Sequence, residues 1–193
     1  PFMKKTLQLS LQGEIYSSPD INMTMSMMTE FGADVKWGGR NLIICQPKPY
    51  TMKDYWIEPD WSAASYWFEI ASFFAQRKGA VDVTLKDLPM YGSIQGDKDV
   101  DRLSTDALRC LKFDEENAVI RSKKRWTKID LLRFYFSQVP DLAQTLVVTC
   151  CMLKTPILFY GLESLWIKET NRMNALKNEL GKLGYDLYED GLG

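Results

Sequence analysis

The chain has 193 residues, of which 46% are hydrophobic and 25% are charged, so it can bury the core of one large domain or parts of two. Its 24 Lys and Arg balance 25 Asp and Glu, and the formal net charge of -1 excludes bulk electrostatic attraction to nucleic acid or to an anionic membrane. The absence of histidine excludes Ser-His and Cys-His nucleophile pairs and most zinc sites. Acid-base chemistry therefore falls to carboxylates and lysines.

The four cysteines, Cys45, Cys110, Cys150 and Cys151, do not have the spacing of metal ligands. Cys150 and Cys151 lie in the apolar run LVVTCCML, where buried free thiols are expected. No apolar run is long enough to span a bilayer, and no signal peptide precedes the first predicted strand. We expect a cytoplasmic protein without a membrane partner, a metal or a nucleic-acid partner.

The first predicted elements are a strand, a helix and two further strands. The alternation of KTLQLSL at 5–11 predicts a strand. Ser17-Ser18-Pro19 is typical of a helix N-terminus, and the helix should run to about Phe31 with Gly32 as its stop. The segments ADVKW and NLIICQP predict two strands, joined by a turn at Gly38-Gly39.

The remaining elements alternate between helix and strand. The apolar run at 61–76 predicts a largely buried helix, capped by Asp60 or Ser62, and VDVTL at 81–85 predicts the next strand. Further helices are predicted at 97–111, 140–152 and 168–183, and further strands at 117–122 and 157–161. This order predicts an α/β fold.

Three segments suggest an internal repeat. MMTEFGADVKW, ALRCLKFDEENAVI and NELGKLGYDLYE each predict the end of a helix and entry into a strand, at a spacing of about 70 to 80 residues. Lys112 replaces the glycine in the middle copy, so that copy needs a different helix stop.

Two stretches carry charged residues in patterns that suggest chemistry. If the last helix begins near Lys168, Lys168 and Arg172 share one face of its first turn, where cations are unfavourable unless an anion lies in front of them. A solvated amphipathic helix is the alternative interpretation. Asp141, in VPDLAQT, is either a first-turn acid that compensates the helix dipole or a catalytic carboxylate.

Four ordered motifs, EPDWSAASYWFEIA, SIQGD, PDLAQT and IKETNR, resemble the enolpyruvyl transferase family, and they are closest to the branch that acts on shikimate 3-phosphate. GEIYSSPDINMTMSMMTEFG resembles a further segment of that family. The resemblance implies two domains of repeated β-α-β-α-β-β units, the inside-out α/β barrel type, present here incompletely. Residues 1–58 would be the end of the first domain, and 59–193 about two units of the second.

The resemblance also implies an activity: transfer of the enolpyruvyl group of phosphoenolpyruvate to the 5-hydroxyl of shikimate 3-phosphate, in aromatic amino acid biosynthesis. The family needs no cofactor or metal, and the full-length form is expected to be a monomer. By motif, Asp141 would take the hydroxyl proton, and Glu169 would handle proton traffic at the methylene carbon. Lys168 would steady the phosphorylated substrate, and Arg172 would bind the phosphoenolpyruvate carboxylate.

Two serines complete the implied site, and two positions depart from the family pattern. Ser17 would meet the shikimate phosphate, and Ser164 stands where the family often has a substrate-binding asparagine. Asp20 stands where the family commonly has tyrosine beside the substrate, and Asn171 replaces the family's aspartate.

Several motifs of the family do not occur in this chain, including its early lysine-serine-arginine motif and its late Asp-His-Arg motif. We therefore expect a fragment that is inactive alone. Two alternatives remain open: a UDP-sugar enolpyruvyl transferase, and a degenerate domain kept as a non-catalytic binding or interaction module.

Overall fold

The computed structural model describes residues 2–77, 79–88, 91–124 and 129–188. The chain begins with a three-stranded antiparallel sheet and one helix. Strands β1 (Leu7–Ser10), β2 (Val35–Gly39) and β3 (Leu42–Cys45) pair in the order β1-β3-β2, and helix α1 (Ser18–Glu30) connects β1 to β2. The predicted strand-helix-strand-strand order is confirmed.

The hairpin between β2 and β3 differs from the prediction in its turn. Gly39 pairs with Leu42, so the loop is Arg40-Asn41, and the predicted turn at Gly38-Gly39 is wrong. Gly38 lies within the strand at a register shift, and a Cβ there would meet the end of the Ile44 side chain, which would have to move. Gly38 thus lies in a strand irregularity beside the neighbouring strand and not in the turn.

The second region, from residue 59 onward, opens with helix α2 (Trp61–Gln76), which Asp60 caps by accepting a hydrogen bond from the Ser62 N–H at 2.8 Å. Strands β4 (Asp82–Thr84), β5 (Leu111–Asp114) and β6 (Val119–Ser122) form an antiparallel sheet in the order β4-β6-β5. The start of α2 and the cap at Asp60 agree with the sequence prediction.

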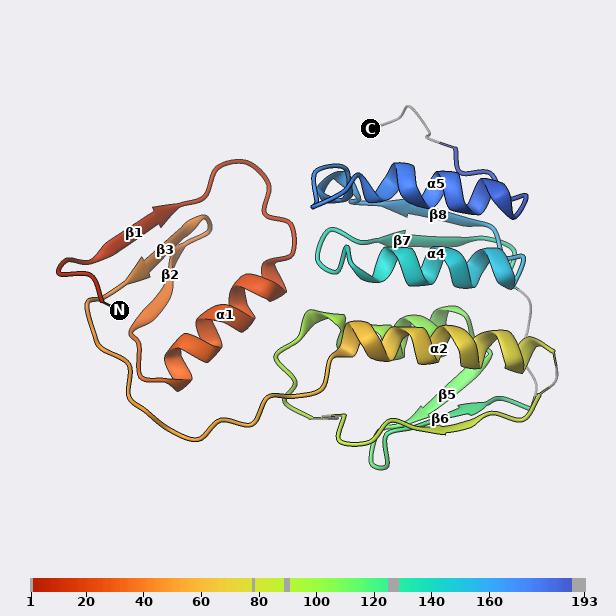
Figure 1. Cartoon of the computed structure of the whole chain (residues 1–193), viewed down its shortest axis with the longest axis horizontal. Coiled ribbons are helices and arrows are strands. Elements are labelled where there is room, and N and C mark those ends of the chain that lie inside the picture. The colour runs from red at the N-terminus through yellow and green to blue at the C-terminus, as the bar shows by residue number, and fades with distance from the viewer. Residues whose placement is uncertain (1, 78, 89–90, 125–128, 189–193) are drawn as a thin grey trace.

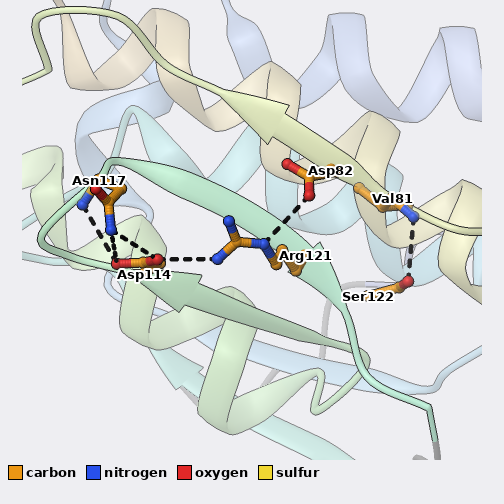
Figure 2. Close-up of polar contacts among 6 residues, drawn as sticks. All are labelled: Val81, Asp82, Asp114, Asn117, Arg121 and Ser122. Carbon is orange, nitrogen blue, oxygen red and sulfur yellow. Dashed lines mark hydrogen bonds and ion pairs between the residues drawn. The ribbon is translucent and has the colours of Figure 1, made fainter.

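Arg121, on the central strand β6, links the three strands of this sheet (Figure 2). Its guanidinium donates to Asp82 of β4 at 3.2 Å and to Asp114 of β5 at 2.9 Å. Asn117, in the β5–β6 turn, donates to Asp114 through its backbone and its side chain. The Asp114 carboxylate therefore fastens both the hairpin turn and the central strand.

The helix predicted at 97–111 is wrong in length. A 3-10 turn (Gly96–Asp99), a short helix α3 (Val100–Arg102) and a π turn (Leu103–Ala107) occupy its first part. Arg109 then adopts a left-handed backbone with φ of 60°, and Leu111 already belongs to β5. Pairing with β6 overrides the local helical pattern of this segment.

The last elements form a parallel pair with two helices. Strands β7 (Leu132–Tyr135) and β8 (Ile157–Tyr160) pair in parallel through helix α4 (Leu142–Met152), and helix α5 (Arg172–Lys182) follows β8. Both β5 and β7 were missed by the sequence prediction. None of the helices in the described part of the chain is both long and apolar enough to cross a membrane.

Helix α5 begins at Arg172, so the predicted start at Lys168 is wrong. Asn171 is its N-cap, and the Asn171 side chain accepts a hydrogen bond from the Asn174 N–H at 3.0 Å. This cap fixes the helix boundary, because it satisfies a backbone donor that has no partner inside the helix. Lys168 therefore lies in the irregular segment before the helix.

The main core belongs to the second region. It is built around α2 and α4 from residues such as Phe68, Leu111, Ile120 and Phe136, which are at most 1% exposed. Helix α1 contains no buried residue. The order of helices and strands confirms the predicted α/β class.

The predicted repeat has a structural counterpart at the helix ends. Gly32 after α1 and Gly184 after α5 have positive φ angles of 89° and 81°, and Arg109 takes the same role before β5 with φ of 60°. The missing glycine of the middle copy is thus replaced by Arg109, and Lys112 lies within a strand. No strand follows Gly184 as far as Tyr188, and the rest of that prediction lies outside the described residues.

The helices of the two regions point their starts toward one another (Figure 1). Helices α2, α4 and α5 all begin on the side of the second region that faces α1, and α1 begins on the side that faces them. The Ser17 N–H donates to the Ser137 carbonyl at 2.8 Å, which ties the start of α1 to the loop after β7. This arrangement puts the N-termini of α2, α4 and α5 on one side of the second region, the side that faces the start of α1.

Candidate functional site

Asp141 is the centre of the candidate site. It holds the N-cap position of α4, but its side chain makes no capping hydrogen bond to that helix. One carboxylate oxygen, Oδ1, accepts instead from Arg172 Nη1 at 2.8 Å and pairs with Lys168 Nζ at 3.2 Å. The Asp141 side chain is 37% exposed, so solvent or a ligand can still reach it.

Arg172 is shared among three acceptors. Besides Asp141, its Nη1 donates to Gln144 Oε1 at 3.2 Å, and its Nη2 pairs with Glu169. The hydrogen bond to Glu169 raises the pKa of Arg172, and the same bond lowers the pKa of Glu169. Glu169 is therefore held as an anion and Arg172 as a cation.

Lys168 and Arg172 meet at Asp141, although the predicted geometry was different. They were expected on one face of a single helix, but Lys168 precedes the helix and Arg172 begins it. Lys168 lies in a run of bends at 167–170, and from there its Nζ reaches Asp141 Oδ1 at 3.2 Å. Asp141, which is 31 residues from Arg172, supplies the anion in front of these cations.

Ser17 and Asp20 bring α1 to the same place. Ser17 is the N-cap of α1 with φ of 54°, and its side chain makes no capping hydrogen bond. Partial loss of water raises the pKa of Asp20 and the charge of Asp141 raises it further, whereas Lys168 and a hydrogen bond with Ser17 lower it. The carboxyl group of Asp20, in the first region, therefore interacts electrostatically with Asp141 and Lys168 of the second region.

Asp97 adds a further carboxyl group. Its Oδ2 accepts a hydrogen bond from Ser62 Oγ at 2.5 Å, and it is half-buried. Burial raises the pKa of Asp97, and the charges of Asp141, Asp20 and Asp60 raise it further. The carboxyl groups of the candidate site therefore come from α1 (Asp20), the 3-10 turn (Asp97), the start of α4 (Asp141) and the segment before α5 (Glu169).

Gln95 fixes the segment on which Asp97 lies. Its Oε1 accepts from the Trp61 N–H, and its Nε2 donates to the Pro59 carbonyl, both at 2.8 Å. The loop in SIQGD is therefore bound to the crossing segment at the start of α2. Gln95 therefore holds the loop against the start of α2, and both polar groups of its side chain already have protein partners.

Ser164 lies in a 3-10 turn (Glu163–Trp166) before α5. Its hydroxyl is buried and has no hydrogen-bond partner among the described residues. A buried hydroxyl without a partner is uncommon, and a ligand group is one way to satisfy it. Substrate binding by Ser164 stays a prediction.

Two residues of the site were not assigned from the sequence. Gln144 follows Asp141 by three positions within PDLAQT, so the helical spacing alone would have placed both on one face of α4. Asp97 gave no comparable signal, because its proximity to Asp141 depends on how distant segments pack. Gln144 could therefore have been found from helical periodicity, and Asp97 could not.

Nucleophilic thiol chemistry has no basis here. Cys45, Cys110 and Cys150 are buried and Cys151 is partly buried; burial raises the pKa of Cys150 to about 12 and also raises the pKa of Cys151. Within the residues that the structure describes, no group of three or more His, Cys, Asp or Glu side chains could hold a metal ion. The described site offers two cations, several carboxyl groups and helix N-termini.

An α/β scaffold that gathers helix N-termini and paired cations around a reachable carboxylate is suited to enzymes that act on small anions. The comparisons with known proteins identify the family. The model of the EPSP synthase (3-phosphoshikimate 1-carboxyvinyltransferase) family matches residues 1–193, so the chain belongs to this family.

Curated relatives carry the same description. The chain is 42% identical over 189 residues to a 3-phosphoshikimate 1-carboxyvinyltransferase of Bacteroides fragilis strain YCH46, covering 98% of the chain and 44% of that relative. It is 29% identical over 199 residues to the protein of that name from Methanosphaera stadtmanae, covering 45% of it. The chain thus spans less than half the length of these relatives.

Among solved structures, the chain is similar to the enolpyruvyl transferase NikO from Streptomyces tendae. The identity is 15% and the TM-score is 0.47, over 75% of this chain and 34% of that one.

Proposed function

We propose that this chain is part of an enzyme that transfers the enolpyruvyl group of phosphoenolpyruvate to the 5-hydroxyl of shikimate 3-phosphate and releases phosphate. The observation that carries the proposal is the convergence of Lys168 and Arg172 on Asp141, on the side of the second region where α2, α4 and α5 begin. The names of the relatives favour shikimate 3-phosphate over a UDP-sugar as acceptor. The proposal invokes no metal and no cofactor.

In this proposal Asp141 accepts the proton of the 5-hydroxyl as its oxygen attacks the enol carbon. Its carboxylate does not cap its own helix, and it stays accessible, which suits a proton acceptor better than a purely structural acid. Lys168, at 3.2 Å, would hold the carboxylate and steady the phosphorylated substrate beside it.

Arg172 and Glu169 would act in sequence. The carboxylate of phosphoenolpyruvate would take over the Arg172 guanidinium, which Glu169 now shares. Glu169 would then lose the hydrogen bond that lowers its pKa, and it would be better able to carry a proton. It could deliver that proton to the methylene carbon and recover it when phosphate leaves.

Ser17 and Ser164 are the remaining proposed substrate contacts. Ser17 lies at the start of α1, whose positive dipole end favours the phosphate of shikimate 3-phosphate. Ser164 would offer its unpartnered hydroxyl to the same substrate. Both assignments depend on the substrate lying between α1 and the starts of α4 and α5.

The replacement of the family's aspartate by Asn171 is a departure that a degenerate, non-catalytic domain would also explain. In the structure Asn171 caps α5 through its side chain oxygen, and asparagine and aspartate are about equally good in this role. The substitution therefore leaves Arg172 at the first position of its helix. This observation favours the catalytic proposal over the degenerate alternative.

The activity should require more than this chain, which spans 44% of the B. fragilis relative. We expect the 193-residue chain alone to release no phosphate from the two substrates. The matched part of the B. fragilis protein can be replaced by this chain, and the chimera assayed for phosphate release. Activity of the chimera would support the proposal, and a folded but inactive chimera would contradict it.

Two variants of the chimera separate the proposed roles. Asp141→Asn should lower the maximal rate by a factor of about 100 to 10000, because it removes the proton acceptor. Arg172→Ala should mainly weaken phosphoenolpyruvate binding, by about 1.5 to 3 kcal/mol for a lost charge-assisted contact. If Asp141→Asn leaves the rate within about twofold in a folded protein, the catalytic assignment of Asp141 fails.

A further inference from the structure

Arg172 has one uncharged hydrogen-bond partner among the described residues, Gln144. Its Nη1 donates to Gln144 Oε1 at 3.2 Å and to Asp141 Oδ1 at 2.8 Å, and its Nη2 pairs with Glu169. A guanidinium has more N–H groups than these acceptors use, so some of them remain for a ligand. The start of α4 therefore holds the Nη1 end of Arg172, and Glu169 holds the Nη2 end.

Packing between α4 and α5 fixes the position of Gln144 relative to Arg172. Val147, three residues after Gln144, is fully buried and packs against Leu176 and Leu180 of α5. Residues three or four apart lie on one face of a helix, so Gln144 lies on the face of α4 that meets α5. For the same reason Arg172 lies on the face of α5 that meets α4. The hydrogen bond between Gln144 and Arg172 thus spans a contact that buried side chains hold, whether or not a ligand is bound.

Glu169 is held much less firmly than Gln144. It lies in the irregular segment before α5, and its side chain is 68% exposed, whereas that of Arg172 is 22% exposed. An exposed ion pair contributes little to stability, because water and salt compete with it. A carboxylate that enters the site can therefore displace Glu169 from Nη2 more easily than it can displace Gln144 from Nη1.

The lack of charge on Gln144 matters because the ion pairs around it are balanced. Two carboxylates, Asp141 and Glu169, pair with two cations, Lys168 and Arg172. A third carboxylate in the place of Gln144 would also hold Arg172, but it would repel an anionic ligand at close range. An amide oxygen accepts the same hydrogen bond without that repulsion.

We propose that Gln144 is a positioning residue, whose uncharged carbonyl oxygen keeps the Arg172 guanidinium in place while an anionic ligand takes over from Glu169. The inference rests on the proposed function for the identity of that ligand, the carboxylate of phosphoenolpyruvate. The hold of Gln144 on Arg172 is a property of the chain itself and can be measured without substrate.

The first measurement is the rate at which the Arg172 guanidinium rotates, followed by NMR in the 193-residue chain without a ligand. In the unchanged chain this rotation should be slower than that of Arg133, which lies at an exposed position on β7. Gln144→Leu should accelerate the rotation of Arg172 about tenfold, in line with the loss of a hydrogen bond to a charged group. Gln144→Glu keeps an acceptor oxygen and should leave the rotation slow. Gln144→Met, which has the length of glutamine without the acceptor, repeats the test if Gln144→Leu does not fold.

The second measurement uses the chimera with the B. fragilis protein. Gln144→Leu should raise the KM for phosphoenolpyruvate about tenfold and leave kcat within about threefold, because Arg172 binds the ligand before the reaction as well as during it. Gln144→Glu should also raise this KM, because its added negative charge opposes the ligand. The two variants should thus share weaker binding but differ in the rotation of Arg172, a pattern that a general loss of stability would not produce.

Gln46→Leu is the matched control. Gln46 is partly buried, as Gln144 is, and its Oε1 also accepts a hydrogen bond, from Thr6 Oγ1 at 2.6 Å in the first region. This substitution should change neither the rotation of Arg172 nor the KM for phosphoenolpyruvate.

Three results would overturn the proposal. The first is a rotation of Arg172 that Gln144→Leu and Gln144→Met leave unchanged. The second is an equal acceleration of that rotation by Gln46→Leu. The third is a fall in kcat as large as the rise in KM, which would mean that Gln144 supports the fold of the site and not the placement of one cation.

The two measurements also separate this inference from the proposed function. An inactive chimera together with faster rotation of Arg172 in Gln144→Leu would support the positioning role and count against the proposed substrate. An active chimera in which Gln144→Leu changes neither the rotation nor the KM for phosphoenolpyruvate would overturn the positioning role and leave the proposed function in place.

Discussion

The two regions of the molecule differ in how much apolar surface they bury and in how much they leave exposed. The first region, residues 2–58, is short of core: helix α1 buries no residue, and the sheet buries Ile43 and Cys45 together with the nearby Ala33. The second region, residues 59–188, has an extensive core but also an uncovered apolar stripe along α2. The stripe consists of Tyr66, Trp67, Ile70 and Phe74, which are 45% to 60% exposed.

The difference separates what stabilises the chain from what positions its chemistry. The second region supplies Asp141, Lys168 and Arg172 from elements that its own core holds. The first region contributes Ser17 and Asp20 from the start of α1, which is joined to the second region by a backbone hydrogen bond from Ser17 to Ser137 and a side-chain hydrogen bond from Ser18 to Gln138. The region with the extensive core thus carries the charge cluster, and the region with few buried residues approaches it.

The largest expected effect comes from a core substitution in the second region. Phe68 is 1% exposed, and Phe68→Ala should lower the free energy of unfolding by about 3 to 5 kcal/mol through lost burial and a cavity. Ile43→Ala, in the first region, should cost about 2 kcal/mol. Urea denaturation gives the totals, and hydrogen exchange locates the loss.

These two variants test whether the regions unfold separately. Ile43→Ala should accelerate exchange in α1 and β1–β3 and leave α2 and α4 protected. If hydrogen exchange accelerated equally in both regions, the two regions would unfold as a single cooperative unit, and the contrast between them would not hold.

Self-association through the α2 stripe should be the next largest effect. Exposed contiguous aromatic surface favours contacts between molecules, and Trp67→Lys/Phe74→Lys should weaken such association by on the order of 2 kcal/mol or more. Light scattering over a concentration series measures it. Met52→Lys, at a position 97% exposed but away from the stripe, is the control. A strictly monomeric unchanged chain would refute the prediction.

A pH-dependent effect should arise at Glu69 in the second region. Burial raises the pKa of Glu69 to about 7, and a small cavity between α2 and α4 adjoins Glu69 and the hydroxyls of Ser65 and Thr145. Because the folded state keeps this proton longer than the unfolded state, stability should fall as the pH rises from about 4.5 to about 7.

Glu69→Gln should remove that loss. At about pH 8 the variant should be more stable than the unchanged chain by about 1 to 3 kcal/mol, and the two should converge at about pH 4.5. Glu116→Gln, at an exposed position in the β5–β6 turn, should show no such difference. A constant offset at all pH values would mean that shape, not charge, distinguishes the variant.

The smallest effect is expected at Asp114, on the sheet shown in Figure 2. Hydrogen bonds from Arg121, and then from Asn117, lower the pKa of Asp114, so its contribution is present above the ordinary aspartate pKa and is lost as the pH falls through the lowered value. Asp114→Asn should flatten the acid limb of stability and speed exchange in the β5–β6 hairpin. Asp130→Asn, at an exposed position just before β7, is the control. An acid limb that is unchanged in Asp114→Asn would exclude this linkage.

Local signals in the sequence determined a good part of this protein. The apolar run of α2 and its Asp60 cap, the stop at Gly32 and the order of helices and strands follow from periodicity and capping, which act over a few residues. The ordered motifs indicated the family, and the resemblance suggested Asp141 and Arg172 as residues of its site. These features required no knowledge of distant contacts.

The tertiary structure alone decided the rest. Strands β5 and β7 exist because they find partners in β6 and β8, and the short segments that form them carry weak local patterns. The cap at Asn171 moved Lys168 out of α5, yet Lys168 still reaches Asp141, because a salt bridge depends on positions in space and not on helical spacing. The influence of Asp20 on this cluster likewise arises from contact between regions that are far apart in the chain.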